Sequence, residues 1–411
     1  MADDLYWDPE HLEEVVSQRA RILGPAVWAA ATPDPRPVIS FAGGLPDIPS
    51  LPGEILARAA RWVVENDEKE ALEYNGTFGP RPLRQVLAER STGIEGIPVA
   101  LENVMVVSGS AHGIGVVCET LLDPGDVVLC ESPNFPGSMR TMRTFGAELV
   151  GVPMDGHGLR VDALEVELKK LAESGRRAKF IYTIPNHQNP AGITLPLDRR
   201  QRIVELARQY RTLILEDDAY GELWFKQPPP PSLYSLSGGD HAIKVSSFSK
   251  ILATGLRMGW TMASPAITSR MASVRYDMGS SAFLGRAIAQ AIRSGELDRH
   301  VAHLREIYRR KLGRMEAALR DHCATRCAWT TPDGGFFLWL LLEPGLPAGD
   351  VQRVANEKGV IIGGGPQYFA DGRATNHLRL AFSYVATEDI EEGINRLAEA
   401  IEEVASAAAA K

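Results

Sequence analysis

The sequence has few cysteines, no long apolar run and no excess of basic residues. Its four cysteines cannot form a disulfide framework for 411 residues, and Cys323 and Cys327 have no second pair of metal ligands nearby. We therefore expect free thiols in a reducing, cytoplasmic environment. No apolar run reaches the length of a membrane span, and the acidic N-terminus does not follow the pattern of a secretory signal. The formal net charge of −8 argues against nucleic acids and anionic membranes as partners.

The rest of the composition, with 45% hydrophobic and 23% charged residues, is typical of a soluble globular protein of two or three domains. Between residues 103 and 263, short apolar segments alternate with amphipathic ones. The expected strands are 104–107, 127–130, 180–184, 213–215, 243–245 and 258–262, and the expected helices include 111–122, 160–174 and 197–210. This alternation predicts an α/β fold, a mostly parallel sheet sandwiched by helices. Ligands of such folds collect at the carboxyl ends of the strands.

The segments on either side of this region follow other patterns. Before it we expect a helix over 9–30, a strand over 38–41 and helices over 54–66 and 81–92. After it, 281–322 is expected to form one long helix or two. The chain then ends in strands 336–342, 359–362 and 377–383 with helices over 349–357 and from Thr387, where acidic residues favour a helix start. These segments predict a smaller α+β domain.

Lys250 stands just past the apolar segment that ends at Val245. A lysine whose amine is kept neutral can form a Schiff base with an aldehyde. The hydroxyls of Ser247 and Ser249 and the guanidinium of Arg257 would together suit a phosphate. The cofactor that carries both an aldehyde and a phosphate is pyridoxal 5'-phosphate (PLP). Taken alone, such a lysine is more often a surface residue in a polar loop.

Polar residues also stand at three other expected strand ends. Gly109 and Ser110 lead into a helix whose first amides would bind an anion, although Ser110 could serve only as a helix cap. Asp217 closes an apolar strand, where a protonated pyridine nitrogen would pair with its carboxylate and make the ring an electron sink. Tyr220 and Asn189 could each hydrogen-bond the phenolic oxygen of that ring, or serve only as turn residues. Together these residues supply what a PLP site needs.

The order of these motifs resembles that of PLP-dependent aminotransferases of fold type I, class I/II. It is most similar to the branch that holds 2-aminoadipate and kynurenine aminotransferases and the catalytic halves of MocR-type regulators. The resemblance covers nearly the whole chain, because it rests on residues 40–46, 109–110, 185–192, 216–220, 246–257, 334–339 and 376–380. It implies an N-terminal arm and part of the small domain in 1–53, a large PLP-binding domain in 54–300 and the C-terminal small domain in 301–411. It also implies a homodimer with shared active sites.

The resemblance further assigns roles to single residues. Lys250 would hold the cofactor as a Schiff base and then move a proton, while Asp217 would pair with the pyridine nitrogen. Asn189 and Tyr220 would hydrogen-bond the ring oxygen, and Arg379 with Asn189 would clamp the substrate α-carboxylate. The rest of the expected site comprises the ring-stacking Phe135, the phosphate-binding Gly109, Ser110, Ala111, Ser247, Ser249 and Arg257, Tyr74 from the neighbouring subunit, and the substrate-side Gly44 and Trp28.

Four stretches depart from the pattern of this branch. Ala111 and His112 stand where glutamines are usual, so we expect the loss of one side-chain contact to the phosphate. Thr254 replaces a common proline, and 363–367 replaces a Val-Pro-Gly-type loop that lines the substrate pocket. Trp28 or its neighbour Val27 takes the place of an arginine that would bind an acidic side chain. We therefore expect an apolar, aromatic or specialised amino acid as substrate rather than 2-aminoadipate.

The expected activity is a ping-pong transfer of an amino group from an L-amino acid to a 2-oxo acid through PLP, with 2-oxoglutarate as a candidate acceptor. A second hypothesis is another PLP reaction on the same scaffold: oxidative deamination, decarboxylation or carbon–carbon bond formation. It stays open because the sequence does not fix which bond of the α-carbon lies perpendicular to the ring. A ligand-sensing regulatory domain is less favoured, since only about 35 residues precede Val38, fewer than a winged helix needs.

Overall fold

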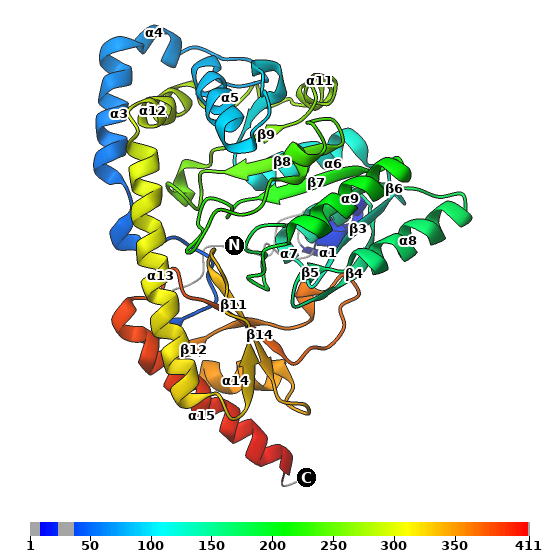
Figure 1. Cartoon of the computed structure of the whole chain (residues 1–411), viewed down its shortest axis with the longest axis vertical. Coiled ribbons are helices and arrows are strands. Elements are labelled where there is room, and N and C mark those ends of the chain that lie inside the picture. The colour runs from blue at the N-terminus through cyan, green and yellow to red at the C-terminus, as the bar shows by residue number, and fades with distance from the viewer. Residues whose placement is uncertain (1–8, 24–36, 410–411) are drawn as a thin grey trace.

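The computed structural model describes residues 9–23 and 37–409, and its largest feature is an eight-stranded sheet (Figure 1). The strand order is β2-β9-β8-β7-β6-β3-β4-β5. The bounds are β2 Val104–Val107, β3 Val127–Ser132, β4 Glu148–Asp155, β5 Gly158–Leu159, β6 Ala178–Thr183, β7 Leu213–Asp218, β8 Ala242–Ser247 and β9 Gly259–Met262. The run from β8 to β4 is parallel, whereas β9 and β5 pair antiparallel with their neighbours. The predicted mostly parallel α/β sheet is confirmed.

Both faces of this sheet are buried from β2 to β3, which explains why these strands read as nearly continuous apolar runs. Along β2, Val104 and Val106 belong to one hydrophobic cluster, and Met105 and Val107 belong to another. The first cluster includes residues of α5 (Arg81–Glu95), α8 (Val161–Glu173), α9 (Leu197–Gln209) and α10 (Leu233–Leu236). The second includes residues of α6 (Ser110–Leu121), α7 (Pro136–Thr144) and α11 (Pro265–Ser273). Helices therefore cover each face of the sheet.

A long helix joins this layer to the lower part of the molecule. The stretch predicted as one helix or two is two helices, α12 (Ala282–Arg293) and α13 (Glu296–His322), and they are separated at Gly295, whose φ is 70°. Figure 1 shows α13 running from beside α12 down to the smaller sheet. Beside α12 lie α3 (Gly53–Asn66) and α4 (Glu68–Ala71).

The smaller sheet is antiparallel, with the order β10-β11-β14-β13. Its strands are β10 Cys327–Trp329, β11 Phe337–Leu342, β14 His377–Ala381 and β13 Gly363–Gly364, and the helices α14 (Ala348–Glu357) and α15 (Ile390–Ala409) complete this part. A separate parallel pair joins β1 (Ile39–Ser40) to β12 (Val360–Ile361). The segment before α3 therefore lies against the C-terminal part of the chain.

The N-terminal helix predicted over 9–30 is broken. In the described part, α1 (Pro9–Val15) and α2 (Gln18–Leu23) are separate, and the predicted continuation through Trp28 lies outside the described residues. Within residues 9–23 and 37–409, no helix combines the length and apolar character needed to cross a membrane.

Candidate active site

Five strands end at one edge of the large sheet. Strands β3, β6, β7 and β8 run in the same direction, and β2 shares it because both β2 and β8 pair antiparallel with β9. The segments that follow these strands contain the polar motifs singled out in the sequence. The structure thus places them along one edge, as expected for a ligand site of an α/β fold.

Lys250 lies in the turn after β8, and its Nζ donates a 2.7 Å hydrogen bond to the carbonyl of Gly44. The same nitrogen lies 5.9 Å from the ring centre of Tyr220. Burial and the positive charges of Arg379 and Arg257 together lower the pKa of Lys250 to about 8, although Asp217 acts in the opposite direction. A larger fraction of this amine is therefore neutral near pH 7 than for an exposed lysine. A neutral amine is what attack on an aldehyde requires.

Asp217 stands near the end of β7 and is only 6% exposed. Its Oδ2 accepts a 2.7 Å hydrogen bond from the hydroxyl of Tyr182, whereas its Oδ1 is buried and has no hydrogen-bond partner among residues 9–23 and 37–409. Burial raises the pKa of Asp217 to about 6, although the Tyr182 hydroxyl and the charge of Lys250 act in the opposite direction. A buried acceptor with no donor is unfavourable. The free oxygen fits the protonated ring nitrogen of PLP.

The predicted phosphate site is built around Gly109 and Arg257. Gly109 has a φ of 87°, and a Cβ there would lie 2.8 Å from Nη2 of Arg257, so a larger residue would displace the guanidinium. Arg257 donates a 3.3 Å hydrogen bond to the Ser108 carbonyl. Nearby in sequence, Ser247 Oγ donates to Ser249 Oγ at 2.9 Å and accepts from the Ser249 amide at 3.1 Å. Two hydroxyls are thus held in one turn.

Ser110 and Ala111 form the first turn of α6, directly after Gly109. Helix starts have free amides that favour an anion. His112 does not extend toward such an anion, because its Nδ1 accepts a 3.0 Å hydrogen bond from the Ser108 amide. Its other ring nitrogen lies 3.8 Å from Asp277. The expected loss of a side-chain contact at this position stays a prediction.

Arg379 on β14 lies beside Asn189, as the resemblance implied. Its Nη1 donates a 3.0 Å hydrogen bond to Oδ1 of Asn189, and its Nη2 donates to the Ala42 carbonyl. Within the part of the chain that the structure describes, its Nε is buried and has no hydrogen-bond partner. The guanidinium carbon lies 4.4 Å from the ring centre of Phe337 and 5.4 Å from that of Tyr368. A guanidinium carries five N–H groups, so beyond these two hydrogen bonds Arg379 keeps donors with which it can bind a planar carboxylate.

For three other residues of the predicted site, the structure gives less detail about their place in it. Phe135 directly precedes α7, with its ring against Gly137, where a Cβ would lie 2.7 Å from ring carbons. Tyr74 is 82% exposed, and Trp28 lies outside the described residues. The expected role of Tyr74 therefore depends on a second subunit.

Two residues of this region were not identified from the sequence. Tyr182, the hydroxyl partner of Asp217, lies within an apolar strand that is buried on both faces, so in the sequence it reads as a core residue. Glu131 is 2% exposed and directly precedes Ser132 at the end of β3. A glutamate at the end of an otherwise apolar strand was the available signal for the second.

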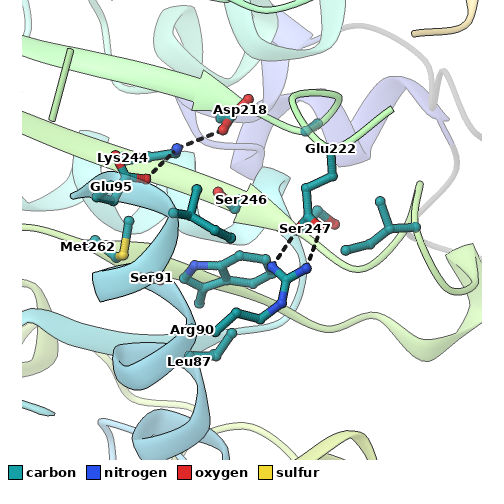
Figure 2. Close-up of a pocket in the computed structure, with 14 residues that line it drawn as sticks. Leu87, Arg90, Ser91, Glu95, Asp218, Glu222, Lys244, Ser246, Ser247 and Met262 are labelled. Atoms are coloured by element: carbon teal, nitrogen blue, oxygen red, sulfur yellow. Dashed lines mark hydrogen bonds and ion pairs between the residues drawn. The ribbon is translucent and has the colours of Figure 1, made fainter. Parts of the chain in front are cut away.

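Buried and partly buried ion pairs lie behind the edge that carries Asp217. Lys244 contacts Glu95 at 2.8 Å and Asp218 at 2.7 Å, and Arg90 contacts Glu222, in a cavity that Ser247 also lines (Figure 2). Burial acts to raise the pKa of Asp218, but Lys244 and a hydrogen bond from Asn186 leave it below its usual value. The ion pair with Lys244 therefore keeps Asp218 ionised, next to Asp217 in the sequence.

The family model for class I and II aminotransferases matches residues 37–397. The chain belongs to this family. It is a PLP-dependent aminotransferase of fold type I, so the predicted family, enzyme class and cofactor are confirmed.

Three similar proteins illustrate this membership. The aromatic-amino-acid aminotransferase 1 of Thermococcus litoralis is 36% identical over 89% of this chain and 88% of its own length. The crystal structure of Pyrococcus horikoshii kynurenine aminotransferase, in complex with PMP, covers 95% of this chain and 98% of its own with 32% identity and a TM-score of 0.89. The α-aminoadipate aminotransferase LysN from Thermus thermophilus, complexed with N-(5'-phosphopyridoxyl)-L-leucine, covers 96% and 99% with 31% identity and a TM-score of 0.88.

Proposed function

We propose that this aminotransferase takes its amino group from an aromatic or apolar L-amino acid and gives it to a 2-oxo acid. The observation that carries the substrate class is the aromatic surrounding of Arg379, which includes Phe337 and Tyr368. Tyr220 packs edge-on against Phe337 at 5.6 Å, and Trp339 packs edge-on against Tyr368 at 5.5 Å. Such rings favour an apolar or aromatic side chain over a carboxylate.

The names of similar proteins agree with this substrate class. One relative is an aromatic-amino-acid aminotransferase, and a structural neighbour is a kynurenine aminotransferase. LysN is named for α-aminoadipate but was crystallised with an adduct of leucine. Aromatic and aliphatic side chains therefore both occur with this fold, and the rings around Arg379 are the features of this chain that favour them.

In the proposed site, each residue acts on a defined part of PLP or substrate. Asp217 would present its unpaired Oδ1 to the ring nitrogen, and Asn189 and Tyr220 would hydrogen-bond the ring oxygen. When bound, PLP supplies an electron sink for the α-carbon of the amino acid. Lys250 would hold the cofactor, and its amine would carry the proton that leaves the α-carbon. Arg379 fixes the α-carboxylate, which orients the α-carbon toward Lys250.

The phosphate and the ring face are held by the remaining residues. The first amides of α6, together with the Ser247 and Ser249 hydroxyls and Arg257, bind the phosphate, and Phe135 stacks on the ring. Gly44 lets the backbone pass close to the Phe337 ring on the proposed substrate side, because a Cβ there would lie 2.5 Å from that ring.

We propose a homodimer in which Tyr74 of each subunit completes the phosphate site of the other. Tyr74 is 82% exposed, and it has exposed apolar neighbours in Leu72, at 73%, and Tyr276, at 86%. The loop that carries Tyr276 lies against the loop that carries Tyr74. Their backbones approach so closely that a Cβ on Gly279 would lie 2.2 Å from the Gly76 carbonyl oxygen. Exposed aromatic residues at one place are typical of an interface.

Four free cysteines support a reducing compartment, for which we propose the cytoplasm.

The test compares kcat/KM for phenylalanine, tyrosine, kynurenine, leucine and 2-aminoadipate with 2-oxoglutarate as acceptor. We expect the highest values with the aromatic or aliphatic donors. A kcat/KM for 2-aminoadipate far above all others would overturn the substrate class. Formation of pyridoxamine phosphate after addition of the donor alone would separate transamination from oxidative deamination or decarboxylation, which consume oxygen or release carbon dioxide. The Lys250→Ala variant serves as the inactive control.

A further inference from the structure

Glu131 lies where the loops that carry Phe135 and Asn189 meet. Its Oε1 accepts a hydrogen bond from the hydroxyl of Thr183. Its Oε2 accepts three more, from the Ile184 amide at 3.2 Å, from Nε2 of Gln188 at 3.1 Å and from Nδ2 of Asn134 at 3.3 Å. These donors come from two loops that follow two different strands. We call Glu131, Asn134, Thr183 and Gln188 the Glu131 cluster.

On one side, the cluster fixes the backbone before Phe135. Asn134 is fully buried, and its Oδ1 accepts a 2.6 Å hydrogen bond from the Phe135 amide. The Asn134 amide donates in turn to the Tyr368 carbonyl at 2.7 Å. Tyr368 is one of the rings beside Arg379. The orientation of Phe135 therefore depends on the Asn134 side chain, which Glu131 holds in place.

On the other side, the cluster fixes the backbone around Asn189. Nε2 of Gln188 donates both to Glu131 and to the Pro133 carbonyl, at 3.0 Å. Its Oε1 accepts from the Ala191 amide at 2.8 Å. Gln188 thus joins the two loops directly and bonds the backbone on the far side of Asn189. A buried network in which every donor finds an acceptor is rigid.

We propose that Glu131 is a positioning residue that fixes Phe135 and Asn189 relative to each other. Phe135 is then already in place for the face of the cofactor ring, and Asn189 for its edge, before the cofactor binds. The inference rests on the proposed roles of Phe135 and Asn189. Its physical basis is that a binding site is accurate only when the residues behind the contacts are themselves held by packing and hydrogen bonds. Glu131 supplies acceptors to donors from both loops.

Two substitutions at this position separate geometry from charge. In Glu131→Gln, the amide oxygen can keep the three N–H donors, and the amide nitrogen can donate to the Thr183 hydroxyl, which also serves as an acceptor. In Glu131→Leu, the volume is nearly kept, but the buried amides of Ile184, Gln188 and Asn134 lose their acceptor. We expect Leu to loosen both loops and Gln to retain them.

The matched control is Glu216→Gln. Glu216 is a fully buried glutamate on β7, and it accepts from the amides of Leu233 and Tyr234 at 3.2 and 2.9 Å. Burial raises the pKa of Glu216 to about 7, as it does for Glu131. Its hydrogen bonds hold the start of α10 rather than the predicted cofactor loops. The control therefore reports the effect of altering a buried glutamate as such.

The experiment measures the dissociation constant of PLP, the visible circular dichroism of the bound cofactor and the melting temperature. Glu131→Leu is expected to weaken PLP binding about tenfold or more and to change the dichroism, since the supporting contacts of a site typically have effects of that order. Glu131→Gln should stay within about threefold of the wild-type constant with the same dichroism. Glu216→Gln should lower the melting temperature and leave both cofactor readouts unchanged.

Wild-type affinity and dichroism in a folded Glu131→Leu protein would overturn the inference. If that variant does not fold, Gln188→Ala breaks the same cluster from the other loop, and its expected tenfold loss decides in the same way. Phe135→Ala and Asn189→Ala separate the two levels of the argument. Were they without effect on affinity and dichroism, the proposed roles would fail and the inference with them. Were they to act while Glu131→Leu did not, the inference alone would fail.

Discussion

The hydroxyl of Tyr182 lies 2.7 Å from Oδ2 of Asp217, and the other carboxylate oxygen is buried and accepts no hydrogen bond from any described residue. The tyrosine therefore stabilises the ionised carboxylate without occupying the oxygen that would face the ring nitrogen. This division explains how a carboxylate whose pKa burial raises to about 6 stays ionised at neutral pH.

Tyr182→Phe should make cofactor binding more sensitive to acid. An ionised Asp217 is needed to attract the protonated ring, so affinity for pyridoxamine phosphate should fall as the pH falls through about 6. Removing the hydroxyl destabilises the ionised form, raises the pKa of Asp217 and moves this fall upward by up to about one pH unit. Titrations between pH 5 and 8 measure the shift. Tyr234→Phe, at a tyrosine that is 1% exposed on α10, should leave the curve unmoved.

Asp217→Asn should retain the fold and lose most of the activity. An asparagine has nearly the same shape, but it cannot hold the ring nitrogen in its protonated state, so the cofactor withdraws electrons less well. We expect kcat to fall by about 10² to 10³, the size found when one group that stabilises charge is removed from an active site. Steady-state kinetics and the melting temperature measure the two properties. A kcat within tenfold of wild type would contradict the pairing of Asp217 with the ring.

Lys250 should react with PLP at an unusually low pH. Because burial and the charges of Arg379 and Arg257 lower its pKa to about 8, the neutral amine forms as the pH rises through 8. The rate at which the apoprotein forms its coloured adduct with PLP should therefore rise to a midpoint near pH 8, well below the value of about 10.4 for a free lysine. Stopped-flow absorbance measures this rate, and Lys250→Ala should form no adduct. A midpoint above pH 10 would disprove the lowered pKa.

Arg379→Lys should impair substrate binding although the charge is kept. A lysine cannot present two parallel donors to a carboxylate, and each lost hydrogen bond to a charged group costs about 1.5–3 kcal/mol. We expect kcat/KM to fall by about 10- to 100-fold, mainly through KM, with little change in the spectrum of the bound cofactor. The exposed Arg353, paired with Glu357 at 2.8 Å, provides a matched Arg→Lys control that should have no effect. An unchanged KM would remove Arg379 from the carboxylate site.

Much of this site could be predicted because its residues follow apolar strands. The runs before Gly109, Asp217 and Lys250 are buried on both faces, so the strands and the edge where they meet were evident from the pattern. Strand β4 was missed, since Gly151 and Pro153 interrupt its apolar run and only Val152 of its eight residues is buried. The antiparallel direction of β9 was equally hidden, because direction is set by connections rather than by composition.

The side-chain contacts that shape the site could not be predicted from the sequence, for a different reason. Tyr182 lies 35 residues from Asp217, and Gln188 lies 57 residues from Glu131. A tyrosine or a glutamate at the end of a strand has many possible partners, and only the packed sheet selects one. The resemblance to a family supplied the roles of Arg379 and Tyr74, which an isolated arginine or an exposed tyrosine would not suggest.

The last prediction concerns the segment that carries Ala42 and Gly44 to the site. It is anchored by Lys311 of α13, which is 2% exposed and donates to the carboxylate of Asp47 and to the carbonyls of Ser383 and Val385, at 2.9 and 2.7 Å. Lys311→Met would leave the carboxylate buried without its cation, and breaking such a pair costs about 3–5 kcal/mol. We expect a melting temperature lower by several degrees.

Lys311→Met should also affect the active site, because the Gly44 carbonyl accepts a hydrogen bond from Lys250 and the Ala42 carbonyl accepts one from Arg379. A loosened segment should raise KM for the amino acid severalfold, whereas loss of stability alone would leave KM unchanged below the melting temperature. The double variant Lys311→Met with Asp47→Leu removes both charges and should recover much of the lost stability, since a buried ion pair can be replaced by apolar residues at little cost. If the double variant were less stable than Lys311→Met alone, the uncompensated carboxylate would not be the cause of the loss.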